Sequence, residues 1–333
     1  MAPSCARNLS AAWEPAARPC DPAGGRRWWV WESAEGCLDA RGDGSGRSGR
    51  IADRDGHVTW NFGGTRARGY RGSVTLDFDD RVLPAATSGA APRVTVVQSS
   101  PDVGLDRFAQ WLTGVDVHLV RADLGEPVPG PTEVGDGLLV LGGQMSAHDD
   151  AVAPWLRPLR DLLAVVSATD VPALGVCLGA QLLAVARGGR VEVAAPPGRE
   201  AGVVDVRWRP EAADDALLGP VAALAGAART SPQPSMHADA VVDLPRGAVW
   251  LASSSMYPFQ AFRIGSAWGV QFHPEATAET LRTWADQHPE VDADAVAAQM
   301  ADRAAEVETT GRAVAEAFTH LVASRAATRR VPV

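Results

Sequence analysis

Cys177 lies in the stretch Gly175-Val176-Cys177-Leu178-Gly179-Ala180-Gln181, between residues that predict a buried strand and residues that predict a helix. A sharp strand-to-helix turn points a nucleophile at the positive end of the helix, which favours the reactive thiolate. Glycines at 175 and 179 permit a strained backbone and a close approach of substrate. The pattern predicts that Cys177 is a nucleophile and that the Leu178 amide faces a developing oxyanion, with Gln181 one turn along the same helix face. A buried core cysteine is the alternative interpretation.

A second candidate group lies far downstream, in the motif His273-Pro274-Glu275. Residues Trp268–Phe272 predict a strand that ends at this motif. Residues two apart in an extended backbone point the same way, and the proline stiffens the link, so Glu275 can reach the imidazole of His273. A base held by an acid is what a cysteine nucleophile requires. Alone, the motif is also compatible with a surface turn.

A third stretch, Leu138–Leu141, predicts an apolar strand that stops at Gly142 and Gly143. Such a turn presents backbone N–H groups to an anionic oxygen, and the loss of one such donor costs about 2.7–4 kcal/mol of barrier. On its own, a pair of glycines after a strand is also typical of an ordinary turn.

Strands and helices alternate regularly from Arg93 onward. This alternation predicts a mostly parallel sheet with helices on both faces, and such sheets bind ligands beyond the carboxyl ends of their strands. Cys177, Gly143 and His273 all follow predicted strands, so we expect them at one edge of the sheet. The predicted strands are 94–98, 116–121, 138–141 and 171–176, and the predicted helices are 106–113 and 153–168.

Shorter strands are predicted at 202–208, 248–252 and 260–264, which indicates a small antiparallel extension that delivers the histidine. After Glu275 the sequence predicts helices over 278–286 and 293–324, the second interrupted near Thr309-Thr310-Gly311. This second helix has one apolar stripe, as in a helix packed on a domain. We expect a domain over 93–276 with C-terminal helices, 277–333, packed on it.

Composition limits the class of protein. The 333 residues are 46% hydrophobic, enough for a sizeable core, and the formal net charge of −9 argues against nonspecific nucleic-acid binding. The sequence has neither a long apolar run nor a secretory signal, so we expect a cytoplasmic protein with no membrane partner. The four cysteines and the histidines show no zinc-type spacing, so neither a metal nor another cofactor is expected.

Residues 1–92 differ in kind, because they show little periodicity of helix or strand type. We expect this N-terminal segment to be poorly ordered or to result from a start codon assigned too far upstream. A small appended domain is one alternative. An RNA-contacting arm is another, since arginine, glycine and aromatic residues suit that role, but the interspersed acids weaken it.

Taken jointly, the three candidate stretches resemble the class I glutamine amidotransferases, the type with a Cys-His-Glu triad. The resemblance runs from about Val94 to Ala276 and is carried by Gly142–Asp150, Gly175–Ala184 and Gln260–Arg263, which leads into the His-Pro-Glu motif. These stretches look most like the free-standing members related to the glutaminase domain of GMP synthase. The resemblance implies a flavodoxin-like α/β fold, a mostly parallel sheet flanked by helices with a small antiparallel extension.

The resemblance also implies roles for single residues. Cys177 would be the nucleophile, His273 the base and acid, and Glu275 its orienting group. The amides of Gly143 and Leu178 would form the oxyanion hole. Contacts with the substrate would come from three segments, through Gly142, Gln181, Ser235, Met236 and His237. The family usually has a serine or tryptophan before this histidine, so Met236 departs from the pattern.

The implied activity is hydrolysis of glutamine through a γ-glutamyl thioester, which releases ammonia. The sequence has neither the Ser-Gly-Gly phosphate loop of an ATP pyrophosphatase nor a GxxxxGK[ST] loop. Either a separate ATP-dependent synthetase subunit receives the ammonia, or the enzyme acts alone on a small substrate. Two alternatives stay open: hydrolysis of another γ-glutamyl amide or a peptide by the same triad, and a non-catalytic regulator with the same fold.

Overall fold

The computed structural model describes residues 32–33, 36–37, 50–52, 58–60 and 90–329. The chain divides into two compact units, Met1–Asp79 and Asp80–Val333. The described part of the first unit consists of two antiparallel strand pairs, β1 (Glu32–Ser33) with β2 (Gly36–Cys37) and β3 (Arg50–Ala52) with β4 (Val58–Trp60). Apart from these strands and residues 90–92, the predictions for residues 1–92 lie outside the described residues.

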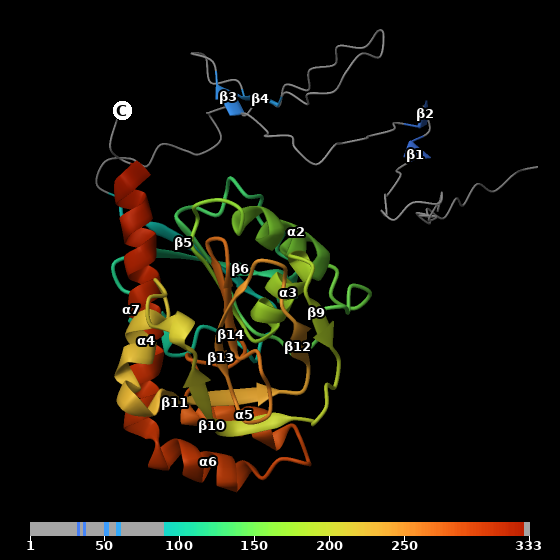
Figure 1. Ribbon diagram of the computed structural model, residues 1–333. Coiled ribbons are helices and arrows are strands. Elements are labelled where there is room, and N and C mark those ends of the chain that lie inside the picture. Colours follow the sequence, from blue (N-terminus) through green and yellow to red (C-terminus); the bar gives the residue numbers. More distant parts are fainter. Residues whose placement is uncertain (1–31, 34–35, 38–49, 53–57, 61–89, 330–333) are drawn as a thin grey trace, which may run out of the picture. The chain divides into compact units, whose positions relative to one another are not determined.

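A single large sheet organises the second unit (Figure 1). Its nine strands follow the order β11-β10-β13-β14-β15-β8-β7-β5-β6. Parallel pairing joins β5 (Arg93–Gln98), β6 (Asp116–Arg121), β7 (Gly137–Val140), β8 (Ala173–Val176) and β15 (Ala267–Val270). Antiparallel pairing adds β14 (Ala261–Ile264), β13 (Val249–Ser253), β10 (Glu200–Trp208) and β11 (Thr230–His237). The sheet is mixed with a parallel core, which confirms the predicted fold class.

Helices cover both faces of the parallel half. Strands that are buried on both faces need apolar residues at successive positions, and every residue of β7 and β8 is buried. One face carries α2 (Leu156–Val166) and α3 (Leu178–Ala186). The other carries α1 (Phe108–Trp111) and α7 (Ala304–Arg329).

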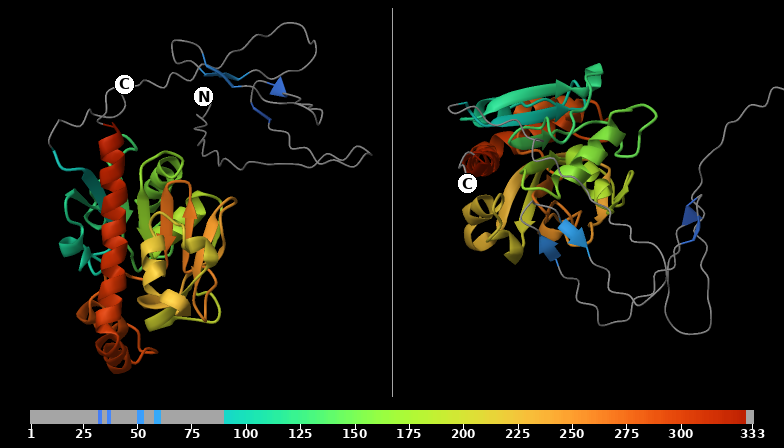
Figure 2. Two further views of the ribbon diagram at one scale, coloured as in Figure 1. Left: turned by 60° about the vertical axis from the view of Figure 1, so that its left-hand side comes forward. Right: turned by 90° about the horizontal axis from the view of Figure 1, so that it is seen from above.

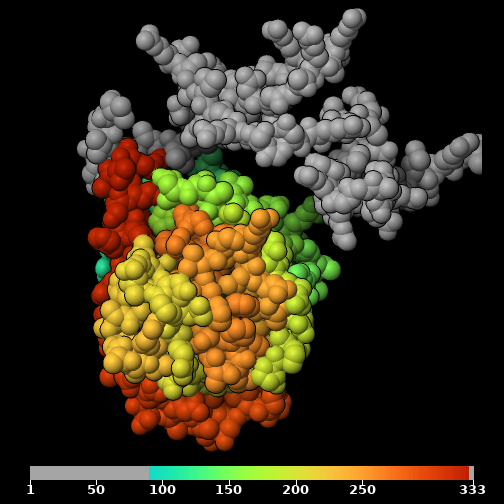
Figure 3. Space-filling view, viewed as in Figure 1, coloured from blue at the N-terminus to red at the C-terminus, as the bar shows by residue number. Residues whose placement is uncertain are grey.

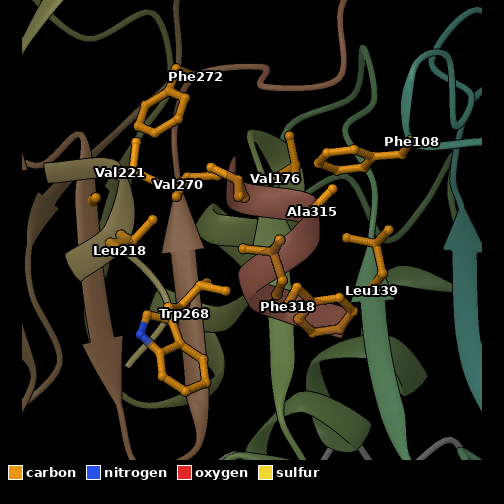
Figure 4. Packing of buried hydrophobic residues seen from close by; sticks show 14 of the residues in the cluster. Phe108, Leu139, Val176, Leu218, Val221, Trp268, Val270, Phe272, Ala315 and Phe318 are labelled. Atoms are coloured by element: carbon orange, nitrogen blue, oxygen red, sulfur yellow. The ribbon is translucent and has the colours of Figure 1, made fainter. Parts of the chain in front are cut away.

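The long C-terminal helix α7 belongs to the hydrophobic core. Figure 4 shows Ala315 and Phe318 of this helix beside Leu139 of β7, Val176 of β8 and Val270 of β15. Phe318 is fully buried. Burial of such a side chain contributes about 1.5–3 kcal/mol to the stability of the fold, so α7 stabilises the sheet.

Two further helices cover the antiparallel half. The helix α5 (Ala278–Asp286) packs against β11, and α6 (Ala293–Asp302) packs against β10. Figure 2 shows α7 spanning the length of the unit, with α6 at one end. In the space-filling view, α6 closes the lower end of this face and α7 its left edge (Figure 3). The remaining described elements are α4 (Gly219–Leu224), the strand pair β9 (Arg190–Glu192) and β12 (Ala240–Asp243), and the short turns η1 (Ala122–Leu124), η2 (Pro210–Ala212) and η3 (Gly226–Ala228).

The structure corrects the predicted interruption of the C-terminal helix. Helix is confirmed over the predicted span, but the break lies at Arg303, between α6 and α7, and not at Thr309-Thr310-Gly311. The two threonine hydroxyls bond back to carbonyls one turn earlier, Thr309 to Ala305 at 2.7 Å and Thr310 to Glu306 at 2.9 Å. Such bonding lets threonine stay inside a helix, so the predicted position of the break was wrong.

The other predicted strands are present within a few residues of their predicted ends. The sequence did not predict β11, whose two prolines disguise a strand, nor β9, β12 and α4. Among the described residues, no helix has the length and apolar character needed to cross a membrane.

Candidate active site

The backbone at Cys177 is strained. Cys177 joins β8 to α3 with φ 50° and ψ −105°, where residues with a β-carbon are rare. A β-carbon on Gly175 would lie 2.5 Å from the Gly179 carbonyl, and one on Gly179 would lie 2.3 Å from the Val140 oxygen. Strand and helix therefore approach too closely for any side chain at these two positions. The sulfur lies at the carboxyl edge of the sheet, beside the N-terminus of α3.

His273 and Glu275 form a short buried pair. The Nδ1 atom of His273 lies 2.7 Å from Oε1 of Glu275, and their side chains are 3% and 1% exposed. The backbone N–H of His273 donates to the Pro234 carbonyl at 2.8 Å, which ties the motif to β11. The Trp284 ring of α5 packs on the imidazole, with 4.5 Å between the ring centres. The Glu275 carboxylate and the contacts with β11 and α5 therefore fix the position of the imidazole.

Cys177 and His273 meet at Gly142. A β-carbon on Gly142 would lie 2.9 Å from the His273 ring and 3.5 Å from the Cys177 β-carbon. Burial lowers the pKa of His273, but the negative charges of Glu275 and Cys177 and hydrogen bonds to both outweigh it and raise the pKa from 6.5 to about 10. The site therefore favours a protonated imidazole at His273, beside the Cys177 side chain.

A cavity of about 370 Å³ opens over Cys177 and His273. Four of the residues predicted to meet the substrate or its oxyanion line this cavity: Gly143, Gln181, Met236 and His237. Three do not, namely Gly142, Leu178 and Ser235. Ser235 is completely buried on β11, and its hydroxyl has no protein partner among the described residues.

Two backbone amides near the sulfur are free. Within residues 90–329, the N–H groups of Gly143 and Leu178 donate to no protein acceptor. The two residues adjoin, since a β-carbon on Gly143 would lie 2.7 Å from the Leu178 side chain. Free N–H groups beside a nucleophile are suited to stabilise a developing oxyanion.

The side chains of Gln181 and His237 form hydrogen bonds with other protein groups. The amide nitrogen of Gln181 donates to the Asp239 carbonyl at 2.9 Å. The ring of His237 has Nδ1 at 3.0 Å from that same carbonyl and Nε2 at 3.1 Å from the Glu200 carboxylate. Because both ring nitrogens already lie at hydrogen-bond distance from protein oxygens, His237 lines the cavity without a ring nitrogen free to bind a ligand.

Several residues of the site were not predicted from the sequence, three of which contact the proposed triad or line the cavity with a charge. Gln271 places its amide nitrogen 3.6 Å from the Cys177 sulfur, Trp284 packs on His273, and Arg199 lines the cavity. A polar residue inside an apolar strand was an available signal for Gln271. Nothing local marks the other two, because only the tertiary fold brings their segments to the site.

Comparison with known proteins gives the class that this fold and site define. The sequence model described as "Glutamine amidotransferase class-I" matches residues 108–284. The chain belongs to this family, as its resemblance predicted. The match stops before α6 and α7, so these helices lie outside the region shared with the family model.

Individual relatives refine this assignment. The chain is similar to the A subunit of the glutamine-hydrolyzing GMP synthase of Halobacterium salinarum, with 35% identity over 163 residues, which are 48% of this chain and 78% of the relative. The corresponding protein of Methanosarcina barkeri is 32% identical over 149 residues, 44% of this chain and 67% of the relative. Similarity to this component of GMP synthase thus agrees with the predicted resemblance.

Solved structures share the fold. A glutamine amidotransferase of Thermotoga maritima has a TM-score of 0.60 at 22% identity, covering 70% of this chain and 98% of its own. A glutamine amido transferase of Methylobacillus flagellatus has a TM-score of 0.58 at 28% identity, covering 72% and 96%. In both cases the matched region covers nearly the whole length of the solved chain.

Proposed function

We propose that this protein hydrolyses the side-chain amide of glutamine, with Cys177, His273 and Glu275 as catalytic triad, and delivers the ammonia to an acceptor on another protein. The observation that carries the proposal is the convergence of the strained cysteine and the 2.7 Å His273–Glu275 pair under one cavity of about 370 Å³. A cavity of this size suits a single small ligand. Membership of the amidotransferase family supports glutamine as that ligand.

The reaction begins when the Cys177 thiolate attacks the side-chain carbonyl carbon of glutamine, which forms a C–S bond and a tetrahedral oxyanion. The amides of Gly143 and Leu178 stabilise the oxyanion. The His273 imidazolium gives its proton to the departing nitrogen, the C–N bond breaks, and ammonia leaves. The neutral imidazole then takes a proton from the water that attacks the thioester, and the thiolate and glutamate are released. Glu275 holds the ring in both steps.

The other predicted substrate residues have different supporting roles in this proposal. Gln181, Met236 and His237 form walls of the cavity. Gly142 leaves room for the imidazole, because a side chain there would collide with it. Ser235 does not line the cavity and is a buried residue of β11. We further propose that residues 93–276 form the amidotransferase domain and that helices 277–333 are packed on it.

Labelling with a glutamine-mimicking electrophile tests the nucleophile without requiring turnover. We expect one adduct per chain, mapped by mass spectrometry to Cys177, and protection by excess glutamine. The other cysteines, Cys5, Cys20 and Cys37, provide an internal control for nonspecific alkylation. Cys177→Ala should lose both the adduct and all glutaminase activity, while its unfolding midpoint changes little. Labelling spread over all four cysteines, or activity in Cys177→Ala, contradicts the proposal.

A separate ATP-using synthetase is the acceptor-bearing partner in this proposal. Its support is the similarity to relatives that are named as one component of a glutamine-hydrolyzing synthase, together with the absence of a phosphate loop from the sequence. Glutamine labelled with ¹⁵N in its side-chain amide should transfer the label to an aminated product only when such a synthetase and ATP are present. Faster turnover of another γ-glutamyl amide than of glutamine, unchanged by any synthetase, favours a stand-alone hydrolase instead.

A further inference from the structure

The active-site cavity is lined by several side chains able to carry positive charge, and their hydrogen-bonding atoms are not equally available. His273 belongs to the proposed triad, and His237 has both ring nitrogens engaged by protein oxygens. Burial, followed by the charge of Arg199, lowers the pKa of His288, although Glu290 opposes this shift, so His288 is a poor cation at neutral pH. None of these three histidines is therefore available to bind an anionic group of a ligand.

Arg199 lines the same cavity, and its guanidinium is a permanent cation with free donors. Its Nε atom donates to Glu290 at 2.9 Å, while no acceptor in the described part of the chain meets its two terminal nitrogens. The Arg199 side chain is 22% exposed, and Glu290 is 57% exposed, so solvent screens the carboxylate more than the guanidinium. Pairing through Nε alone orients the planar group and leaves its outer edge, with two parallel N–H donors, open to a ligand.

We infer that Arg199 binds the α-carboxylate of the amino-acid substrate through the two terminal nitrogens of its guanidinium. This inference rests on the proposed function, and it adds that the enzyme acts on a free amino acid whose carboxylate is unblocked. A carboxylate matches the guanidinium fork with two parallel hydrogen bonds, whereas a neutral carboxamide accepts only through one oxygen. Glu290 is the positioning residue, because it holds Arg199 at the cavity wall.

The chain offers a matched control for this inference. Arg199 lines two cavities, the active-site cavity and a neighbouring one of about 1050 Å³ between β10 and α6. Arg207 lies on β10, the strand that begins directly after Arg199, is exposed, and of these two cavities lines only the second. Arg207→Gln removes the same charge from the same surface without touching the active-site cavity.

Binding is measured by calorimetry in the Cys177→Ala background, so that no turnover is needed. The ligands are glutamine and glutaminamide, in which a carboxamide replaces the α-carboxylate. Arg199→Gln should weaken the binding of glutamine about 10- to 100-fold and that of glutaminamide less than about 3-fold. The reason is that a charged hydrogen-bonded pair is lost only for glutamine. Arg199→Lys, which keeps the charge but not the fork, should give an intermediate loss. Arg207→Gln should change neither affinity.

Several results overturn the inference. These are an equal loss for both ligands in Arg199→Gln, an unchanged affinity for glutamine, or no binding of glutamine in the Cys177→Ala protein. Should Arg199→Gln fail to fold, Arg199→Lys decides by the same comparison. Turnover of glutamine by the unmodified protein is a separate readout. If turnover is absent but the binding pattern holds, the proposed function fails while the carboxylate site stands.

Discussion

The two sides of the active site are supported in different ways. Cys177 is positioned by its own neighbours in sequence, since Gly175 and Gly179 allow β8 and α3 to meet in a strained turn. His273 and Glu275 are positioned by segments far away in the sequence. The position of the proposed nucleophile therefore depends on local backbone chemistry, and that of the proposed base and its acid depends on tertiary packing.

The contacts that support the histidine side come from three directions. The backbone of His273 bonds to Pro234 of β11, and the Glu275 carbonyl accepts from the Arg107 N–H at the start of α1 at 3.2 Å. A β-carbon on Gly311 of α7 would lie 2.2 Å from the Pro274 carbonyl oxygen. The motif is thus enclosed by β11, α1 and α7.

On both sides of the site, however, a glycine within a helix allows a backbone carbonyl to approach closely. On the cysteine side a backbone carbonyl, that of Val140, contacts Gly179 of α3, and on the histidine side the Pro274 carbonyl contacts Gly311 of α7. Alanine is the better helix former, so each glycine is retained against helix propensity for a close approach. Replacing either glycine by alanine tests which side is less tolerant.

Gly179→Ala should have the largest effect. The new β-carbon would lie 2.3 Å from the Val140 carbonyl oxygen, in a region where both partners are backbone and cannot turn aside. We expect a loss of about 3 kcal/mol or more of unfolding free energy, with loss of the active site. Urea unfolding measures this. Gly104→Ala is the control, because its β-carbon would have only an ordinary contact of 3.9 Å with Gln98. An equal, small effect of both substitutions contradicts the strained turn.

Glu275→Gln should leave the fold intact and lower kcat by roughly 100- to 10,000-fold. A carboxamide keeps the size of the side chain but removes the charge that holds the His273 imidazolium, 2.7 Å away. Steady-state kinetics should show the loss in kcat and little change in KM. Exposed Glu279→Gln, on α5, is the matched control. A variant with full kcat would remove Glu275 from the proposed triad.

The cysteine side could be predicted from the sequence because its determinants are neighbours. Gly175, Cys177 and Gly179 stand within one turn, and the strand and helix on either side have clear patterns. The predicted strand Asp116–Arg121 agrees with β6 residue for residue, as does the predicted helix Ala278–Asp286 with α5. Buried apolar runs and one-sided helices carry their signal locally.

The support of the histidine side could not be predicted. Gly311 was interpreted as an interruption, whereas in the structure it lets α7 approach the Pro274 carbonyl. Trp284, which packs on His273, and Arg199, which lines the cavity, have no local pattern that points to the site. Such roles depend on which segments the fold brings together, and a single sequence does not carry that information.

The charge of His273 gives the histidine side a pH dependence. Its pKa is 6.5 in an ordinary setting and about 10 here, so the folded protein holds a proton that the unfolded chain releases. This stabilisation is complete below pH 6.5 and is lost as the pH rises through 10. Glu275→Gln removes one of the charges that raise the pKa. The difference in unfolding free energy between the two proteins should therefore shrink from pH 6.5 to pH 10, as followed by urea unfolding. A difference that stays constant over this range contradicts the ion pair.

Gly311→Ala should have the smallest effect, and its sign is informative. Helix propensity alone predicts that alanine stabilises α7 by about 1 kcal/mol. The collision with the Pro274 carbonyl predicts the opposite, a net loss of about 1–2 kcal/mol and a fall in kcat of roughly 10-fold as the His273–Glu275 pair shifts. Thr309 lies on the exposed face of the same helix. Thr309→Ala gains helix propensity without a new contact, so it should stabilise α7 or leave its stability unchanged, and it should leave kcat unchanged. If Gly311→Ala behaves like Thr309→Ala, α7 does not position the proposed base, and the support of His273 comes from β11, α1 and α5.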